Sequence, residues 1–279
     1  LWRRAMNAIL GIAQLRAAAT YNAAADCFDS VPLGFWHRHG AKTVARLDLM
    51  DGAEVLDVGC GSGASAVPAA KAVGPNGHVT GIDVAENMLR LAIRKAHFAG
   101  VRNLTFQMAD MTASGFPAHH FDAVIANHAI FFAPDMKALV AELWRMVKPG
   151  GQLAVTVWAK DPFEPAAGIF TQELIQVCPD MDAPKRPWVK LTSPDGLAKL
   201  FADSGVATPV ITHVEDAQPL MRPDDFWTVA SGSGYRREID QMSYQERTLL
   251  RERLVRRLSD ANCTAINTSA LIAVATKPL

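Results

Sequence analysis

The feature that most constrains the fold is the segment at residues 54–63, which reads E-V-L-D-V-G-C-G-S-G. Its first half is a short apolar, β-branched run, typical of a strand buried on both faces of a parallel sheet. The run ends in Gly59, Gly61 and Gly63. Glycines tolerate positive φ and let backbone N–H groups approach a ligand closely. A helix predicted over 65–73 would direct its N-terminus at whatever occupies this glycine turn.

A second apolar strand, predicted over 78–82, ends in Asp83, 20 residues beyond Gly63. A carboxylate at this place can accept hydrogen bonds from ribose hydroxyls, so the pattern predicts a nucleoside-cofactor site. Gly59, Gly61 and Ala64 also satisfy the loose dinucleotide fingerprint G-x-G-x-x-G/A. The glycines alone therefore do not decide between cofactors.

Asp57 separates the two cofactor classes, because it lies at the end of the first strand, two residues before Gly59. We expect its carboxylate to point into the ligand crevice, where it would favour a cationic ligand and repel a pyrophosphate. S-adenosylmethionine carries a sulfonium, an ammonium and a ribose but no phosphate, whereas NAD carries two phosphates. The position of Asp57 favours S-adenosylmethionine.

The pattern of Asp57, the three glycines and Asp83 resembles the class I S-adenosylmethionine-dependent methyltransferases, whose first motif commonly reads L-D-[VL]-G-[CT]-G-[ST]-G. The run R-M-V-K-P-G-G at 145–151 is similar to another motif of that family. The nearest resemblance is to the ubiquinone/menaquinone-type branch. It implies S-adenosyl-L-methionine as cofactor, S-adenosyl-L-homocysteine as product, and cofactor contacts at Asp57, Gly59, Gly61, Gly63, Asp83, Val84, Met88, Asp110, Met111 and Asn127.

Asn127 and His128 end the predicted strand 121–126, beside the end of the first strand, where ligands collect in such sheets. His128 has suitable acidity for a general base, although a hydrogen-bonding residue behind the reaction centre would show the same pattern. Tyr21 belongs to a segment resembling the family's Y-[DN]-x-x-A-x-x-[FY] opening, which implies a place near the methyl donor. An ordinary packing role for Tyr21 stays open. His37 and His39 would lie on different helix faces, so we expect no metal site.

Aromatic residues gather around the predicted crevice and indicate a small apolar acceptor that is aromatic, quinone-like or long-chain. We predict acceptor contacts at Phe35, Trp36, Phe131, Phe132 and Trp158. A predicted helix at 244–258 carries five arginines beside a leucine stripe. This pattern is typical of a helix whose basic face is exposed to solvent, and it would also fit a lid that contacts an anionic acceptor. We expect methylation of an oxygen, a nitrogen or a carbon of the acceptor. The resemblance implies a role in cofactor or secondary-metabolite biosynthesis.

The predicted fold is α/β, a Rossmann-like doubly wound sheet of seven strands, with the last strand antiparallel as the resemblance implies. Residues 1–50 would form a helical cover, and 51–160 the cofactor-binding core. Residues 161–279 would complete the same domain. They hold strands near 206–214 and 265–275 and insertions after strands five and six, at 161–191 and 217–263, that cap the substrate.

Composition sets further bounds. The chain has 279 residues, with 28 basic and 28 acidic side chains, so no basic footprint indicates nucleic-acid binding. Its four cysteines are far apart, which indicates neither a disulfide framework nor a zinc site and fits a reducing cytoplasm. No apolar run reaches the roughly 20 residues of a membrane span. The first residues resemble a signal peptide, but Trp2, Met6 and Ile9 repeat at helical spacing, which favours an amphipathic helix. We expect a monomer or homodimer.

Three other classes of protein share part of this motif pattern. A short-chain NAD(P)-dependent oxidoreductase would carry Tyr-x-x-x-Lys, and none of the three tyrosines is followed in this way. A nucleic-acid methyltransferase would carry a motif such as N-P-P-[YF] where this chain has Asn127-His128. A protein of the same fold that binds S-adenosylmethionine for a regulatory or non-methylating role would share every motif described, so this alternative stays open.

Overall fold

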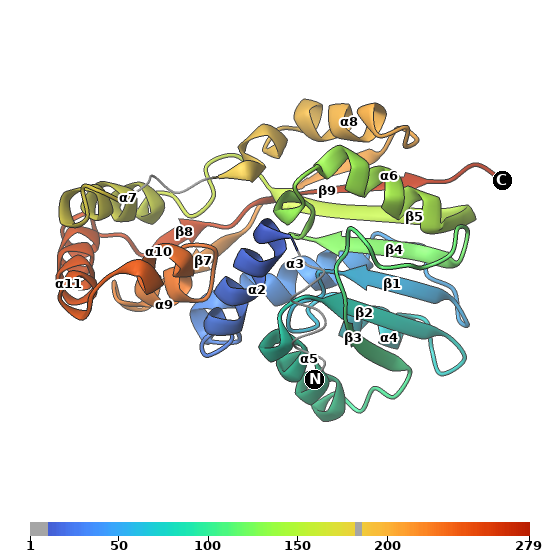
Figure 1. Cartoon of the computed structure of the whole chain (residues 1–279), viewed down its shortest axis with the longest axis horizontal. Helices are drawn as coiled ribbons and strands as arrows, with labels where there is room; N and C mark the ends of the chain where they lie inside the picture. The colour runs from blue at the N-terminus through green and yellow to red at the C-terminus, as the bar shows by residue number, and fades with distance from the viewer. Residues whose placement is uncertain (1–10, 182–185) are drawn as a thin grey trace.

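The computed structural model describes residues 11–181 and 186–279 and is built on a seven-stranded sheet in the order β3-β2-β1-β4-β5-β9-β6 (Figure 1). Strands β1 to β5 are mutually parallel, and β9 runs antiparallel to both neighbours. The predicted fold, including the antiparallel last strand, is confirmed. The strands are β1 (Glu54–Val58), β2 (His78–Asp83), β3 (Leu104–Met108), β4 (Phe121–Asn127), β5 (Val147–Trp158), β6 (Val210–Val214) and β9 (Ala270–Thr276).

Helices cover both faces of the sheet because successive side chains of each central strand point to opposite sides. Val55 of β1 packs with α3 (Phe35–Val44) and α4 (Ala66–Ala72) on one face. Leu56 packs on the other, with α6 (Met136–Met146) and α8 (Pro194–Asp203). Helix α5 (Glu86–Phe98) connects β2 to β3. This alternation explains why β1 reads as a continuous apolar run.

The two predicted insertions come together as one helical cap beside the sheet (Figure 1). Helix α7 (Ala166–Val177) from the first packs on α11 (Tyr244–Asp260) from the second. Helices α9 (Asp225–Ser231) and α10 (Arg236–Gln241) complete the cap, and short 3-10 turns lie at η1 (Val31–Leu33), η2 (Ile130–Phe132) and η3 (Pro187–Leu191). Helix α2 (Ile12–Ala24) lies with α3 between cap and sheet in the view of Figure 1.

Three of the arginines of α11 have carboxylate partners within the cap. Arg251 pairs with Asp224, and both Arg253 and Arg257 pair with the buried Glu173 of α7. Leu250, Leu254 and Leu258 form the buried stripe. These arginines therefore tie α11 to its neighbours and are not directed at a ligand crevice.

The boundaries differ from the prediction mainly near the end of the chain. The strand predicted over 265–275 is split into β8 (Ala265–Asn267), which pairs with β7 (Ala217–Pro219), and β9. The split occurs where Thr268 and Ser269 hydrogen-bond to Asp216 instead of continuing the ladder. Strand β6 begins at Val210, later than predicted. The amphipathic helix predicted around Trp2, Met6 and Ile9 lies outside the described residues.

None of the helices within 11–181 and 186–279 has the length and apolarity that crossing a lipid bilayer requires.

Candidate active site

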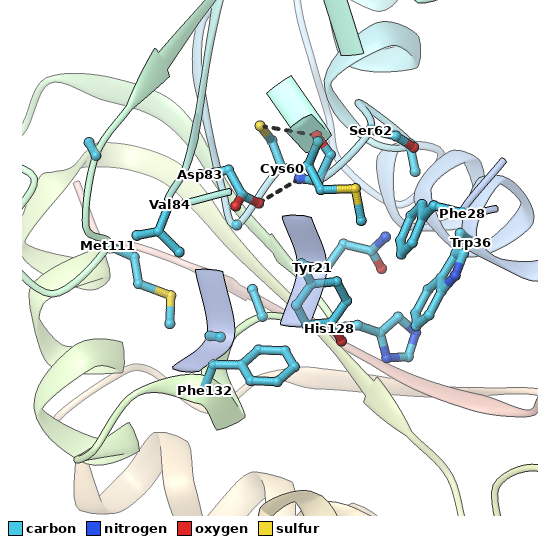
Figure 2. Close-up of a pocket in the computed structure, with 18 of the residues that line it drawn as sticks. Tyr21, Phe28, Trp36, Cys60, Ser62, Asp83, Val84, Met111, His128 and Phe132 are labelled. Atoms are coloured by element: carbon cyan, nitrogen blue, oxygen red, sulfur yellow. Dashed lines mark hydrogen bonds between the residues drawn. The ribbon is translucent and has the colours of Figure 1, made fainter. Parts of the chain in front are cut away.

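A pocket opens where β1, β2 and β4 end, and it encloses about 860 Å³ of space that is partly open to solvent. We call it the first pocket. Figure 2 shows Asp83, Val84 and Met111 on one side of it and Tyr21, His128 and Trp36 on the other. The predicted residues that line it are Gly59, Gly61, Asp83, Val84, Met88, Asp110, Met111 and Asn127, together with His128 and Tyr21.

The glycine turn follows β1 with Gly59 at φ 62° and Gly61 at φ 53°, a region that only glycine enters without strain. A Cβ on Gly61 would meet no atom within 4 Å, so the turn leaves open space at this wall of the pocket. The Gly61 N–H donates to Asp83 Oδ2 at 2.9 Å, and the Ala85 N–H donates to Oδ1 at 2.8 Å. The two bonds hold the Asp83 carboxylate at the pocket wall.

Asp57 lies deeper than the sequence suggested, because its side chain is fully buried and does not line the first pocket. The Ser65 hydroxyl donates to its Oδ2 at 2.7 Å, while Oδ1 has no hydrogen-bond partner. Burial raises the pKa of the Asp57 carboxyl to about 7, with a contribution from nearby Asp83. Gly63 also lies outside the lining. Asp57 therefore lies beneath the turn and not at the pocket wall, and burial disfavours its charged form.

The charge of the first pocket fits a cationic nucleoside. Among the described residues, its lining contains the carboxylates Asp83 and Asp110 but no lysine or arginine. The Asn127 Oδ1 is buried without a donor. Apolar contacts come from Val84, Met88 and Met111. The described lining thus offers acceptors for ribose hydroxyls and an ammonium group, and no cation for a pyrophosphate.

His128 lies at the end of β4 with φ 55°, an unusual backbone conformation for a residue with a side chain. Its Nε2 is 2.8 Å from Nδ1 of His39, which belongs to α3. Both side chains are buried, and the His128 ring lies tilted against Trp158 with 4.1 Å between ring centroids. The His128 Nδ1 has no hydrogen-bond partner. Backbone strain of this kind often marks a functional residue.

The far side of His39 faces Asp216, which lies between β6 and β7. His39 Nε2 is 3.5 Å from Asp216 Oδ2, an ion-pair separation that is long for a hydrogen bond. Arg38 donates twice to this carboxylate from Nε and Nη2, and Thr268 donates to Oδ2 at 2.8 Å. Burial opposes ionisation, but these donors hold the pKa of Asp216 well below its usual range. We call the three residues the Asp216–His39–His128 series.

Burial keeps both histidines neutral, since it lowers the pKa of His39 and lowers that of His128 well below the usual value. Asp216 opposes this effect at His39, and the His39 ring adds to it at His128. Tyr21 contacts Phe28 and Phe132 edge-on. Burial raises the pKa of the Tyr21 hydroxyl well above its normal range, so Tyr21 is a neutral donor or acceptor.

A second pocket adjoins the first and encloses about 1140 Å³, also partly open to solvent. Tyr21, Trp36 and Phe132 line both pockets. Of the predicted acceptor residues, Trp36, Phe131, Phe132 and Trp158 line the second pocket. Phe35 does not, because it is fully buried behind Trp36 and Trp158.

The sequence did not single out several residues that the structure places at these pockets. His39 was set aside with His37 as an unpromising metal pair, and Asp216 carried no local signal. Trp188 and Tyr235 line the second pocket as well, and they belong to the two insertions that the sequence predicts to cap the substrate. Among the described residues, no group of three or more His, Cys, Asp or Glu side chains is arranged to hold a metal ion.

Comparison with known proteins agrees with the fold. Residues 55–151 match a family model described as a methyltransferase domain, and this span contains β1 to β4, the glycine turn and His128. Residues 55–151 are therefore similar to a methyltransferase domain, and the resemblance to methyltransferases that the sequence predicts is confirmed.

Several named methyltransferases are similar to part of this chain. Aklanonic acid methyltransferase DauC of Streptomyces sp. (strain C5) is 34% identical over 136 residues, which are 49% of this chain and 62% of that protein. Demethylmenaquinone methyltransferase of Listeria welshimeri is 35% identical over 113 residues, 40% of this chain and 48% of that one. The matches thus span about half to three fifths of these relatives. A solved structure of phosphoethanolamine N-methyltransferase 2 of Haemonchus contortus, in complex with S-adenosyl-L-methionine, has the same fold with a TM-score of 0.53. The similarity covers 87% of this chain and 53% of that chain, at 20% sequence identity.

Proposed function

We propose that this protein transfers a methyl group from S-adenosyl-L-methionine to an oxygen, nitrogen or carbon of a small, largely apolar acceptor. The observation that carries the proposal is the first pocket, whose described lining combines Asp83 at the expected ribose position with acidic and apolar walls and has no lysine or arginine. An NAD(P)-dependent reaction is disfavoured because a pyrophosphate would find no cation there. The similarity to small-molecule methyltransferases supports the same reaction.

The residues fit the cofactor in separate regions of the first pocket. Asp83 would accept from the ribose hydroxyls, and Asp110 with Met111 would contact the adenine, as in the resembling family. The unpartnered Asn127 Oδ1 is available to the ammonium group. When bound, S-adenosylmethionine supplies an electrophilic methyl group on its sulfonium. The chain itself contributes alignment, and alignment of reacting groups can be worth roughly 7–11 kcal/mol.

The acceptor would occupy the second pocket, which we therefore call the acceptor pocket. Tyr21, Trp36 and Phe132 line both pockets, so the reacting atoms would meet beside these side chains. His128 lines the first pocket close to this junction, and Figure 2 shows it next to Tyr21. The aromatic walls would exclude water and hold a planar or long-chain apolar molecule.

His128 would act as the proton acceptor where the acceptor atom must lose a proton. The carboxylate of Asp216 favours a proton on His39 Nε2, which leaves the lone pair on His39 Nδ1. His39 Nδ1 then accepts from His128 Nε2–H at 2.8 Å, so His128 Nδ1 is the unprotonated nitrogen. His39 and Asp216 are positioning residues in this scheme. A general base contributes on the order of 10²- to 10⁴-fold.

Calorimetric titration with S-adenosylmethionine, S-adenosylhomocysteine and NADPH tests the proposal. We expect micromolar binding of the first two compounds and none of NADPH. Asp83→Ala should abolish binding, whereas Asp203→Ala, which removes a carboxylate from the exposed end of α8, should leave it unchanged. Binding of NADPH alone would refute the assignment of the cofactor. Binding without methyl transfer to any acceptor would favour the regulatory or non-methylating alternative.

The setting of the reaction is also a proposal. All four cysteines are free, as expected of a protein working in the reducing cytoplasm. We retain a monomer or homodimer as the expected assembly, and cofactor or secondary-metabolite biosynthesis as the expected role.

A further inference from the structure

The walls of the acceptor pocket are aromatic on nearly every side. Trp158 contacts Phe163 at 4.7 Å between ring centroids, and Phe131 contacts Trp188 at 5.6 Å. These rings come from different parts of the chain, the strand ends and the cap, and would enclose a flat molecule between them. The aromatic lining residues are Tyr21, Trp36, Phe131, Phe132, Trp158, Phe163, Trp188 and Tyr235.

Two indole N–H groups of these walls have no hydrogen-bond partner. The Nε1 atoms of Trp36 and Trp188 are buried, and Trp36 is only 7% exposed. An indole nitrogen is a donor and never an acceptor. Because buried donors nearly always have a hydrogen-bond acceptor, two buried N–H groups without one need an explanation. A bound molecule with oxygen acceptors would supply one.

Three guanidinium groups also line this pocket, from Arg16 of α2, Arg186 and Arg237 of α10. Within the described residues none of them forms an ion pair, although Arg186 Nη2 donates to Thr171 Oγ1 at 2.8 Å and the group lies 5.9 Å from the Tyr235 ring centroid. The single acid of the described lining is Glu238. Burial raises the pKa of Glu238, although the charges of Arg237 and Arg186 oppose this effect, and Glu238 forms no ion pair with either arginine within the described residues.

The two pockets therefore carry opposite charge preferences. The first has carboxylates and no arginine, whereas the acceptor pocket has three arginines and one buried acid. The arginines of α11 differ from these three, since Arg251 is held by Asp224 within the cap. Guanidinium groups bind carboxylates and other anionic oxygens strongly and with two parallel bonds. The charges at the acceptor pocket are thus available to a ligand.

We infer that the methyl acceptor is an aromatic compound with an anionic oxygen group, held with its ring among the aromatic walls and its anion near Arg186 and Arg237. The inference rests on the proposed function and deepens it, since it narrows a largely apolar acceptor to an aromatic acid or ionised enol or phenol. The free indole N–H groups of Trp36 and Trp188 would donate to further oxygens on the same molecule.

A matched pair of probes tests the charge requirement: 1-hydroxy-2-naphthoate, which is anionic, and 1-hydroxy-2-naphthamide, which is neutral and of the same shape. Each is titrated into the protein saturated with S-adenosylhomocysteine, and binding is followed by calorimetry. We expect the naphthoate to bind at least about tenfold more tightly, the size expected of one hydrogen bond to a charged group. The preference should shrink with added salt, because salt screens the attraction.

Variants locate the anion. The double variant Arg186→Gln with Arg237→Gln should lose the preference for naphthoate while still binding S-adenosylhomocysteine. Arg251→Gln, on the same cap but paired with Asp224, should keep it. Trp188→Phe retains the ring and removes the N–H, so it should weaken both probes by a few fold.

The outcomes separate this inference from the proposed function. Failure to bind S-adenosylhomocysteine would contradict the proposed function before either probe is used. Normal cofactor binding with equal affinity for the two probes, or with no binding of either at millimolar concentration, would overturn the inference alone. So would a preference for naphthoate that survives in the double arginine variant.

Discussion

His39 Nδ1 lies 2.8 Å from His128 Nε2, in a contact between a helix ahead of the sheet and the end of a central strand. Both nitrogens are buried, so one ring must donate and the other must accept. Asp216, on the other side of His39, decides between the two arrangements, because a carboxylate accepts and does not donate. Through His39, the Asp216 carboxylate thereby determines which nitrogen of His128 carries the proton, and Nδ1 is left without one.

The tautomer of His128 is the first prediction. In the native protein bound to S-adenosylhomocysteine we expect His128 to carry its proton on Nε2, as long-range ¹H–¹⁵N correlation spectra of labelled histidine report. Asp216→Asn should produce the other tautomer or a mixture, since an amide can also donate to His39. His37→Gln, which changes the half-exposed histidine of α3 that pairs with Asp29, should leave the spectrum of His128 unchanged. A native His128 with its proton on Nδ1 would contradict the scheme.

Removal of the imidazole is the second prediction. His128→Ala should keep the affinity for S-adenosylhomocysteine within about threefold and lower kcat by on the order of 10²- to 10⁴-fold on an acceptor that must lose a proton. The loss should be smallest at high pH, where solvent hydroxide replaces the base. Full turnover by the variant on the true acceptor would exclude His128 as the base.

The ionisation of Asp57 gives the third prediction. Burial raises the pKa of this carboxyl to about 7, so between its unfolded value and 7 the folded chain binds more protons than the unfolded chain. Stability should therefore be highest at the acidic end of this window and fall as the pH rises from about 4 to 7. In urea unfolding at pH 5 and pH 7.5, Asp57→Asn should reduce this fall by on the order of 1–4 kcal/mol. An unchanged pH dependence would show that Asp57 ionises normally.

Local patterns predicted the sheet and the cofactor side of the site because their determinants are close in sequence. The strand, the glycine turn and Asp83 lie within a single strand–helix–strand unit, and their spacing alone brings them together. The burial of Asp57 was not apparent, because a strand-end carboxylate can point into the crevice or beneath the turn, and Ser65 holds it beneath.

The reaction side of the site could not be predicted in the same way. Arg38, beside His39, reaches Asp216 across 178 residues of sequence, and His39 reaches His128 across 89. Only the packing of α3 against the sheet creates this series. The role of the α11 arginines could not be predicted for the same reason, since Glu173 lies on α7 and Asp224 lies just before α9. Sequence periodicity shows which face is charged but not what it meets.

The packing of α3 on the glycine turn gives the last prediction. Gly40 follows His39, and a Cβ on it would lie 2.2 Å from the Ala64 carbonyl oxygen, too close for any side chain. Gly40→Ala must push α3 away from the turn, because the obstacle is backbone and cannot rotate aside. We expect a loss of about 1–3 kcal/mol in the free energy of unfolding, together with weaker S-adenosylhomocysteine binding and a perturbed His128 spectrum as His39 moves. Gly234→Ala, where a Cβ would meet nothing within 4 Å, is the matched control and should unfold like the native protein. Equal stability of the two variants, measured by urea unfolding, would show that α3 does not depend on this close approach to hold His39 in place.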